Sequence, residues 1–184
     1  CTYLKDFGAA TASNGSVGLY HIDNLTPEAK EQGESLIKEG AKVYVIDDAE
    51  LARVKASYPV IWKDKDAKPK LCFMGCPHMT LAQLNDWTER LEAKLKEKGR
   101  KKVTIKTVFT SAPDVIKEFD KGENAAKLKA MGVTLSYICP LMYMNNPLCA
   151  KMPVITNSNK LRTYTTSRYY TDAEILEQIT GGKR

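Results

Sequence analysis

Hydrophobic positions between residues 70 and 138 alternate between strand spacing and helix spacing. The short apolar run 71–74 predicts a buried strand. Apolar residues then recur every three or four positions from 81 to 95, which predicts a helix, and Thr80 with Gln83 forms a capping box at its start. The pattern therefore begins with a strand followed by a helix.

The same alternation continues toward the carboxyl end of the chain. Residues 103–109 are rich in β-branched side chains and predict a second strand, and apolar positions from 115 to 128 predict a second helix. Residues 133–138 predict a third strand, and 153–156 a fourth. This β-α-β-α-β order favours right-handed crossovers. We therefore expect an α/β fold in which a parallel sheet carries helices on both faces.

The first third of the chain predicts a smaller amino-terminal α/β lobe. Its expected elements are a helix at 4–13, strands at 15–21 and 43–46, and a helix at 49–56. Polar, lysine-rich residues follow at 62–69 and suit a connection between lobes. We divide the chain into an amino-terminal lobe, residues 1–62, and a βαβ domain, residues 63–184.

Composition excludes several classes of function. The chain has 184 residues, 43% of them hydrophobic and 27% charged, which is ordinary for a globular protein. No apolar run approaches the roughly 20 residues that cross a membrane, and no export signal is visible, so we expect a cytoplasmic protein. The net charge of +6 is spread over mixed runs, which argues against nucleic-acid binding and is compatible with small anionic substrates.

Two of the five cysteines follow predicted strands. Cys76 comes after the strand at 71–74, and Cys139 after the strand at 133–138. The carboxyl ends of parallel strands meet at the edge where α/β proteins bind ligands, so these two thiols can face one site. A metal or iron–sulfur site, a redox thiol pair, a zinc site and simple burial all remain open. Cys72, inside a strand, and Cys149 are expected to be buried packing residues.

Polar residues are expected at the same edge. They are Thr110, Ser111, Asn157 and Ser158, together with the amino end of the helix that begins near Thr80. Hydroxyls, an amide and a helix amino end suit a carboxylate or phosphate lying opposite a metal. His78 is a candidate ligand or substrate-orienting group, unless it bonds only the local turn. Lys160 is a candidate anion contact, although a surface lysine is the default reading.

Six ordered stretches resemble the large subunit of the aconitase X family, the compact dehydratases of the aconitase superfamily. They are residues 8–17, 19–22, 25–29, 75–81 with Gly75-Cys76-Pro77-His78, the strand ending at Cys139, and 154–160 with Thr156-Asn157-Ser158-Asn159-Lys160. The resemblance implies an aconitase-like fold. It also implies an iron–sulfur hydro-lyase acting on a small hydroxy acid of the mevalonate 5-phosphate or cis-3-hydroxy-L-proline type.

The resemblance also implies roles for individual residues. Cys76 and Cys139 would be two of three cysteine ligands to a 4Fe–4S or 2Fe–2S cluster. The substrate-binding residues would be Thr156, Asn157, Ser158, Lys160 and His78. The base that removes a proton would lie outside this chain, as in a serine of the small subunit.

The chain departs from the family pattern at the third ligand. Cys1-Thr2-Tyr3 lacks the proline of the family's cysteine segment, and nothing favours Cys149 as a substitute. We therefore expect the third cysteine ligand outside this chain. The chain is interpreted as the carboxyl-terminal part of a large subunit, inactive without the missing amino-terminal half and the small subunit. The competing hypothesis is a non-catalytic α/β domain that binds a ligand or partner.

Overall fold

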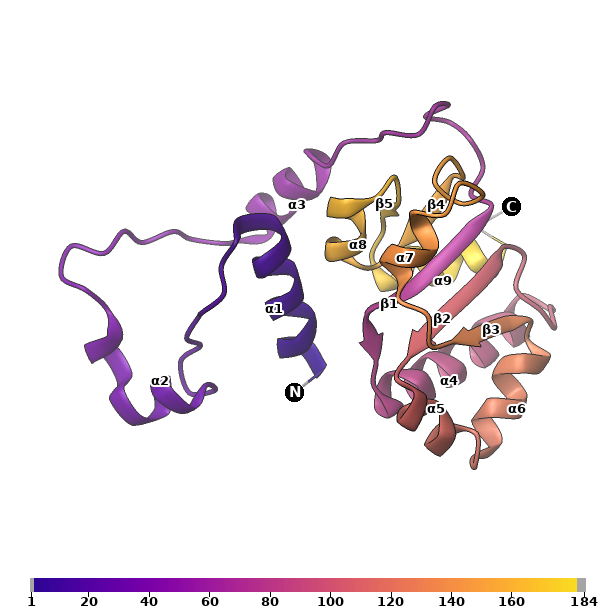
Figure 1. The fold of residues 1–184 in the computed structure, drawn as a ribbon, viewed down its shortest axis with the longest axis horizontal. Helices are drawn as coiled ribbons and strands as arrows, with labels where there is room; N and C mark the ends of the chain where they lie inside the picture. Colours follow the sequence, from indigo (N-terminus) through magenta and orange to yellow (C-terminus); the bar gives the residue numbers. More distant parts are fainter. Residues whose placement is uncertain (1, 182–184) are drawn as a thin grey trace.

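A sheet of five parallel strands forms the centre of the carboxyl-terminal two thirds of the protein, on the right in Figure 1. The computed structural model describes residues 2–181, and Cys1 lies outside them. The strand order is β3-β2-β1-β4-β5. The bounds are β1 Leu71–Met79, β2 Lys106–Ser111, β3 Val133–Ser136, β4 Val154–Thr156 and β5 Arg168–Tyr169. Every strand pair is parallel, which confirms the predicted α/β fold.

Helices follow the strands in the predicted alternation. In the sheet domain they are α4 Leu81–Glu97, α5 Pro113–Phe119, α6 Glu123–Ala130, α7 Pro140–Met144, α8 Asn159–Tyr164 and α9 Asp172–Ile179. The predicted capping box is present, since Thr80 Oγ1 accepts from Gln83 N–H and Gln83 Oε1 accepts from Thr80 N–H. The single helix predicted across 115–128 is instead two helices, α5 and α6, separated by a turn at 120–122.

The sheet is covered on both faces because successive strand residues point in opposite directions. Cys72 and Met74 belong to one core, which contains buried side chains of α4, α6 and α9. Leu71 and Phe73 belong to a second core, which contains buried side chains of α7 and α8. Helices on both faces were predicted, and the two separate cores confirm it.

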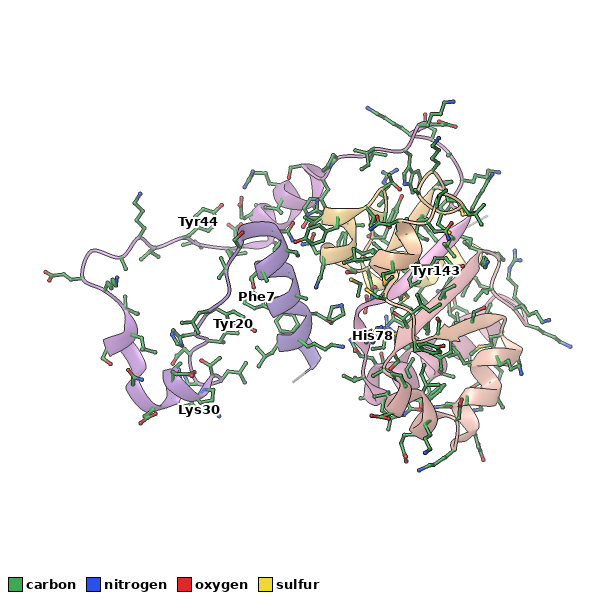
Figure 2. All side chains as sticks on the ribbon, viewed as in Figure 1. Phe7, Tyr20, Lys30, Tyr44, His78 and Tyr143 are labelled. Carbon is green, nitrogen blue, oxygen red and sulfur yellow. The ribbon has the colours of Figure 1, made fainter. Side chains whose placement is uncertain are left out.

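The first helix, α1 (Thr2–Gly15), packs against α8 and β1. Phe7 meets Tyr20 edge-on, with ring centroids 4.9 Å apart (Figure 2). Beyond α1 the chain runs outward through α2 (Pro27–Gln32), a 3-10 turn (Gly33–Leu36) and an extended segment to α3 (Asp48–Ala56), which leads back to the sheet (Figure 1). None of the described helices is long and apolar enough to span a membrane.

Two predicted strands are absent from the described residues. Residues 15–21 and 43–46 are not strands, so between residues 2 and 62 the structure contains helices and extended chain rather than an α/β lobe. The physical reason is pairing, because a strand exists only beside another strand, and neither segment has one. The third strand is also shorter than predicted and ends at Ser136.

Candidate functional site

The end of β1 departs from regular pairing just before Cys76. β1 pairs with β2 from Leu71 to Met74 and again at Met79, with an irregularity between. Gly75 has a φ of +104°, and a Cβ there would lie 2.3 Å from the carbonyl oxygen of Thr110. Glycine at position 75 therefore allows β1 to pass close to Thr110 of β2 and to continue to Cys76.

The hydroxyls expected at the end of β2 are used inside the protein. Thr110 and Ser111 are fully buried. Thr110 Oγ1 donates to the Gly75 carbonyl at 2.8 Å, and Ser111 Oγ donates to the Met79 carbonyl at 2.6 Å. Both were predicted as polar groups facing a ligand, and the structure corrects this to groups that hold the end of β1.

Cys76 is buried and is attached through its backbone to the segment after β4. The Ser158 hydroxyl donates to the Cys76 carbonyl and accepts the Leu161 N–H at 2.9 Å, which caps α8. Burial raises the pKa of the Cys76 thiol, Ser158 and Lys160 act in the opposite direction, and Cys139 adds to the rise. The hydrogen bond from Ser158 thus joins the strand that carries Cys76 to the loop that follows β4.

Cys139 lies at the other expected strand end. It occupies the N-cap position of α7, just after β3, and is exposed. Within residues 2–181 no three histidine, cysteine or acidic side chains gather into a metal-binding group. Cys72 and Cys149 are buried, as expected of packing residues.

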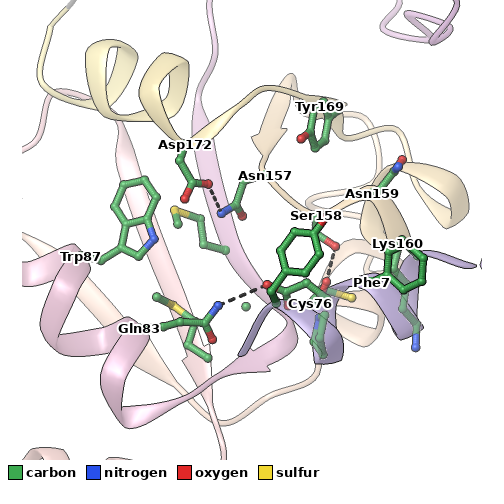
Figure 3. A pocket seen from close by; sticks show the side chains of 17 residues that line it. Phe7, Cys76, Gln83, Trp87, Asn157, Ser158, Asn159, Lys160, Tyr169 and Asp172 are labelled. Atoms are coloured by element: carbon green, nitrogen blue, oxygen red, sulfur yellow. Dashed lines mark hydrogen bonds between the residues drawn. The ribbon is translucent and has the colours of Figure 1, made fainter. Parts of the chain in front are cut away.

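A cavity of about 360 Å³ lies beside Cys76 (Figure 3). Its walls come from α1, β1, α4, the loop after β4, the start of α8, the end of β5 and the start of α9. Four predicted site residues line it together: Cys76, Asn157, Ser158 and Lys160. The cavity therefore joins one of the two candidate ligands to three of the five candidate substrate-binding residues.

The other predicted site residues lie away from this lining. The side chain of Thr156 is fully buried, and its Oγ1 accepts the Ser158 N–H at 3.1 Å. His78 is half-buried, and its backbone carbonyl accepts from the Lys5 ammonium. Neither these two side chains nor Cys139 contributes to the lining of the cavity.

Asp172, at the start of α9, is a cavity residue that sequence reasoning missed. Asn157 Nδ2 donates to Asp172 Oδ1 at 2.8 Å (Figure 3). Because a carboxylate only accepts, the amide nitrogen must face Asp172, and the carbonyl oxygen of Asn157 is left to accept from another donor. Arg90 lies 3.6 Å from Asp172 Oδ2 and stacks 4.6 Å above the ring of Trp87, which also lines the cavity. This network fixes which end of the Asn157 amide is free.

The α1 wall was also missed. Lys5 Nζ donates to Gln83 Oε1 at 3.0 Å, and Gln83 Nε2 donates to Asp6 at 3.3 Å. Burial lowers the pKa of Lys5 and raises that of Asp6, although each opposes the shift of the other. Burial and the nearby Lys5 lower the pKa of His78. The capping box located Gln83, whereas no sequence signal placed α1 over the site.

Two family models match the chain in order. The model of the aconitase X second domain matches residues 2–56, and the model of the aconitase X third domain matches residues 69–178. The second match alone covers more than half of the chain.

Curated relatives carry a consistent name. The chain is 27% identical over 187 aligned positions to the phosphomevalonate dehydratase large subunit of Methanosarcina mazei, which covers 98% of this chain and 42% of that protein. It is 33% identical over 89 positions to the protein of that name from Thermococcus kodakarensis, covering 48% of this chain and 21% of the relative. The chain spans less than half the length of these relatives.

A solved structure has the same fold. The crystal structure of Thermococcus kodakaraensis aconitase X in its holo-form superposes with a TM-score of 0.77 at 22% identity, covering 98% of this chain and 44% of that one. The ordered family matches and the shared fold confirm the resemblance drawn from the motifs: the chain belongs to the aconitase X family.

Proposed function

We propose that this chain is part of a hydro-lyase that dehydrates a small hydroxy acid. The observation that carries the proposal is the cavity that brings Cys76 together with Asn157, Ser158 and Lys160. The relatives' name, phosphomevalonate dehydratase large subunit, favours a substrate of the mevalonate 5-phosphate type over one of the cis-3-hydroxy-L-proline type.

The two candidate ligands fit part of an iron–sulfur site. Such clusters are held by cysteine thiolates, and both Cys76 and Cys139 are free thiols. Since the described residues contain no group of three metal-binding side chains, the chain would supply two ligands and require another cysteine from outside. When bound, a cluster of this type supplies a Lewis-acidic iron that polarises a substrate hydroxyl.

The remaining cavity residues would bind and orient the substrate. The ammonium of Lys160 suits a carboxylate or phosphate, and the free carbonyl oxygen of Asn157 suits a substrate hydroxyl. Ser158 would position both Cys76 and Lys160, because its hydroxyl donates to the Cys76 carbonyl and caps the helix that carries Lys160. Thr156 would contribute by holding the Ser158 amide rather than by touching the substrate.

Two partners would complete the enzyme. The remaining portion of the large subunit would supply the third cysteine, and a small subunit would supply the base that removes the proton. The relatives are named as large subunits, which supports a partner of that kind. On this proposal the chain alone does not turn over substrate.

Iron and sulfide content tests the proposal. After anaerobic reconstitution, the chain alone should hold little iron, and the assembly with the remaining large-subunit portion and the small subunit should hold one cluster. Cys76→Ala and Cys139→Ala should each remove the cluster from the assembly. Cys149→Ala is the matched control, because it deletes another buried thiol away from the cavity. Unchanged iron content in both ligand variants would refute the assignment.

A binding domain without catalysis is the second candidate. It is favoured by a cavity lined by Asn157, Ser158 and Lys160 that has no complete set of metal ligands among the described residues. This alternative predicts that the chain alone binds mevalonate 5-phosphate in calorimetry, and that Lys160→Met abolishes binding. Absence of binding by the isolated chain, together with a cluster in the assembly, would exclude it.

A further inference from the structure

The amino-terminal third of the chain matches a domain but has almost no core. Residues 2–56 match the model of the aconitase X second domain. Of the side chains described between residues 3 and 56, Ala29 alone is buried. A domain must bury apolar surface to offset the conformational entropy lost on folding, and this segment buries too little to do so. To form a core, this segment therefore needs further apolar surface from outside itself.

The largest unburied apolar feature in this segment is the run Val43-Tyr44-Val45-Ile46. These side chains are 89%, 70%, 73% and 67% exposed. Figure 2 shows Tyr44 on the extended segment that leads to α3, far from the sheet. No backbone–backbone hydrogen bond joins residues 42–46 to any other described residue. The hydroxyl of Tyr44 donates to the Glu50 carboxylate, which is a local contact. Both the backbone and the side chains of the run are thus available to a partner.

The sequence of the run indicates what kind of partner it fits. In a strand, Val43 and Val45 would face one side, and Tyr44 and Ile46 the other, so both sides are apolar. A strand that is apolar on both sides is typical of the interior of a sheet that is covered on both faces. A second copy of this chain would add only one strand, and a two-stranded ribbon is marginally stable. The run therefore fits a partner that brings further strands and a covering layer.

We propose that residues 42–46 form an interior strand of a sheet completed by the portion of the aconitase X large subunit that this chain does not span. The chain covers 42% of the Methanosarcina mazei large subunit and 44% of the crystallised aconitase X chain, so more than half of each has no counterpart here. A second and a third domain also imply a first. The inference rests on family membership and not on the proposed reaction, so a complex without dehydratase activity would leave it intact.

Hydrogen–deuterium exchange tests the interface directly. The probe is the remaining portion of the large subunit from the same organism, expressed as a separate polypeptide and mixed with the full chain. Alone, the amides of residues 42–46 should exchange at the rate of unstructured chain. In the complex their exchange should slow at least about 100-fold, because each interior-strand amide gains a hydrogen bond shielded from water.

Two variants distinguish strand pairing from non-specific hydrophobic association. Val45→Pro removes a backbone donor and should weaken binding about 10- to 100-fold by leaving a carbonyl of the partner unpaired. Val45→Lys should weaken it by placing a charge in the covered face. Ile61→Pro is the matched control, since Ile61 is an exposed β-branched residue in extended chain that also makes no backbone–backbone hydrogen bond to a described residue. All three should keep the wild-type urea midpoint when alone, because neither position lies in the core.

Three results would overturn the proposal. One is a complex in which residues 42–46 still exchange rapidly. Another is the absence of any complex when each polypeptide is folded by circular dichroism. The third is a homodimer in light scattering that Val45→Pro dissociates, which would assign the run to a second copy of the chain.

Discussion

Replacing Gly75 with alanine should lower the free energy of unfolding more than replacing Gly99, because a Cβ added at Gly75 would collide with the backbone of Thr110. Gly75 has a φ of +104°, and an added Cβ would lie 2.3 Å from the Thr110 carbonyl oxygen and 2.4 Å from its Oγ1. Gly99, after α4, has a φ of +62°, and an added Cβ would meet nothing within 4 Å. Comparing the alanine variants of Gly75 and Gly99 therefore separates the free-energy cost of a left-handed backbone from the cost of steric overlap.

The magnitudes follow from these two situations. A left-handed conformation costs a residue with a Cβ roughly 1–2 kcal/mol, which applies to both variants. Overpacking beside a rigid backbone adds about 1–3 kcal/mol at Gly75 alone. We therefore expect Gly99→Ala to lose about 1–2 kcal/mol and Gly75→Ala about 2–5 kcal/mol. Domains of this size are stable by about 5–15 kcal/mol, so both variants should remain folded.

Urea unfolding followed by circular dichroism measures the difference. The free energies of unfolding of the wild type and the two alanine variants are compared by linear extrapolation. Because Gly75 directly precedes Cys76, the same variant should also increase the labelling rate of the Cys76 thiol. Equal destabilisation by Gly75→Ala and Gly99→Ala would refute the close approach of β1 to Thr110.

Three further predictions address the site and the surface. Ser158→Ala should lower the free energy of unfolding by about 1.5–4 kcal/mol, because it removes a helix cap and leaves the buried Cys76 carbonyl without its donor. Urea unfolding measures this loss, and a loss below about 0.5 kcal/mol would contradict the prediction. Lys94 of α4 and Lys98, the residue after this helix, lower the pKa of Glu177 from 4.5 to about 2. The contribution of Glu177 to stability is therefore complete above pH 4.5 and disappears as the pH falls toward 2. The urea midpoints of Glu177→Gln and wild type should therefore differ at pH 6 and converge near pH 2, and a constant difference would argue against the ion pairs. A thiol reagent followed by peptide mass spectrometry should modify the exposed Cys139 well before Cys72, whose pKa is raised by complete burial, and equal rates would contradict the core position of Cys72.

The sheet domain was predictable because its signals are local. Each strand–helix repeat between residues 70 and 138 carries its own apolar spacing, and the Thr80–Gln83 capping box marks a helix start in the sequence. Parallel order then follows from the alternation of strands and helices. The same reasoning placed Cys76, Asn157 and Ser158 at carboxyl ends of strands, where the cavity is found.

The strands expected before residue 62 were not predictable in the same way. The run Val43–Ile46 has strand composition, yet a strand requires a neighbour, and the described residues offer none. The composition of this run thus indicates a preference for strand conformation, but a strand forms only where a neighbouring strand is present to pair with it.

By itself, the sequence determined the α/β class, the strand order along the chain and the family, since these depend on local spacing and ordered motifs. Only the tertiary structure decided which polar groups remain available at the site. Thr110, Ser111 and Thr156 are used in internal hydrogen bonds, whereas Asp172 and α1 reach the cavity from distant parts of the chain. The physical reason is that a buried polar group must find a partner, and its partner depends on long-range packing rather than on neighbours in sequence.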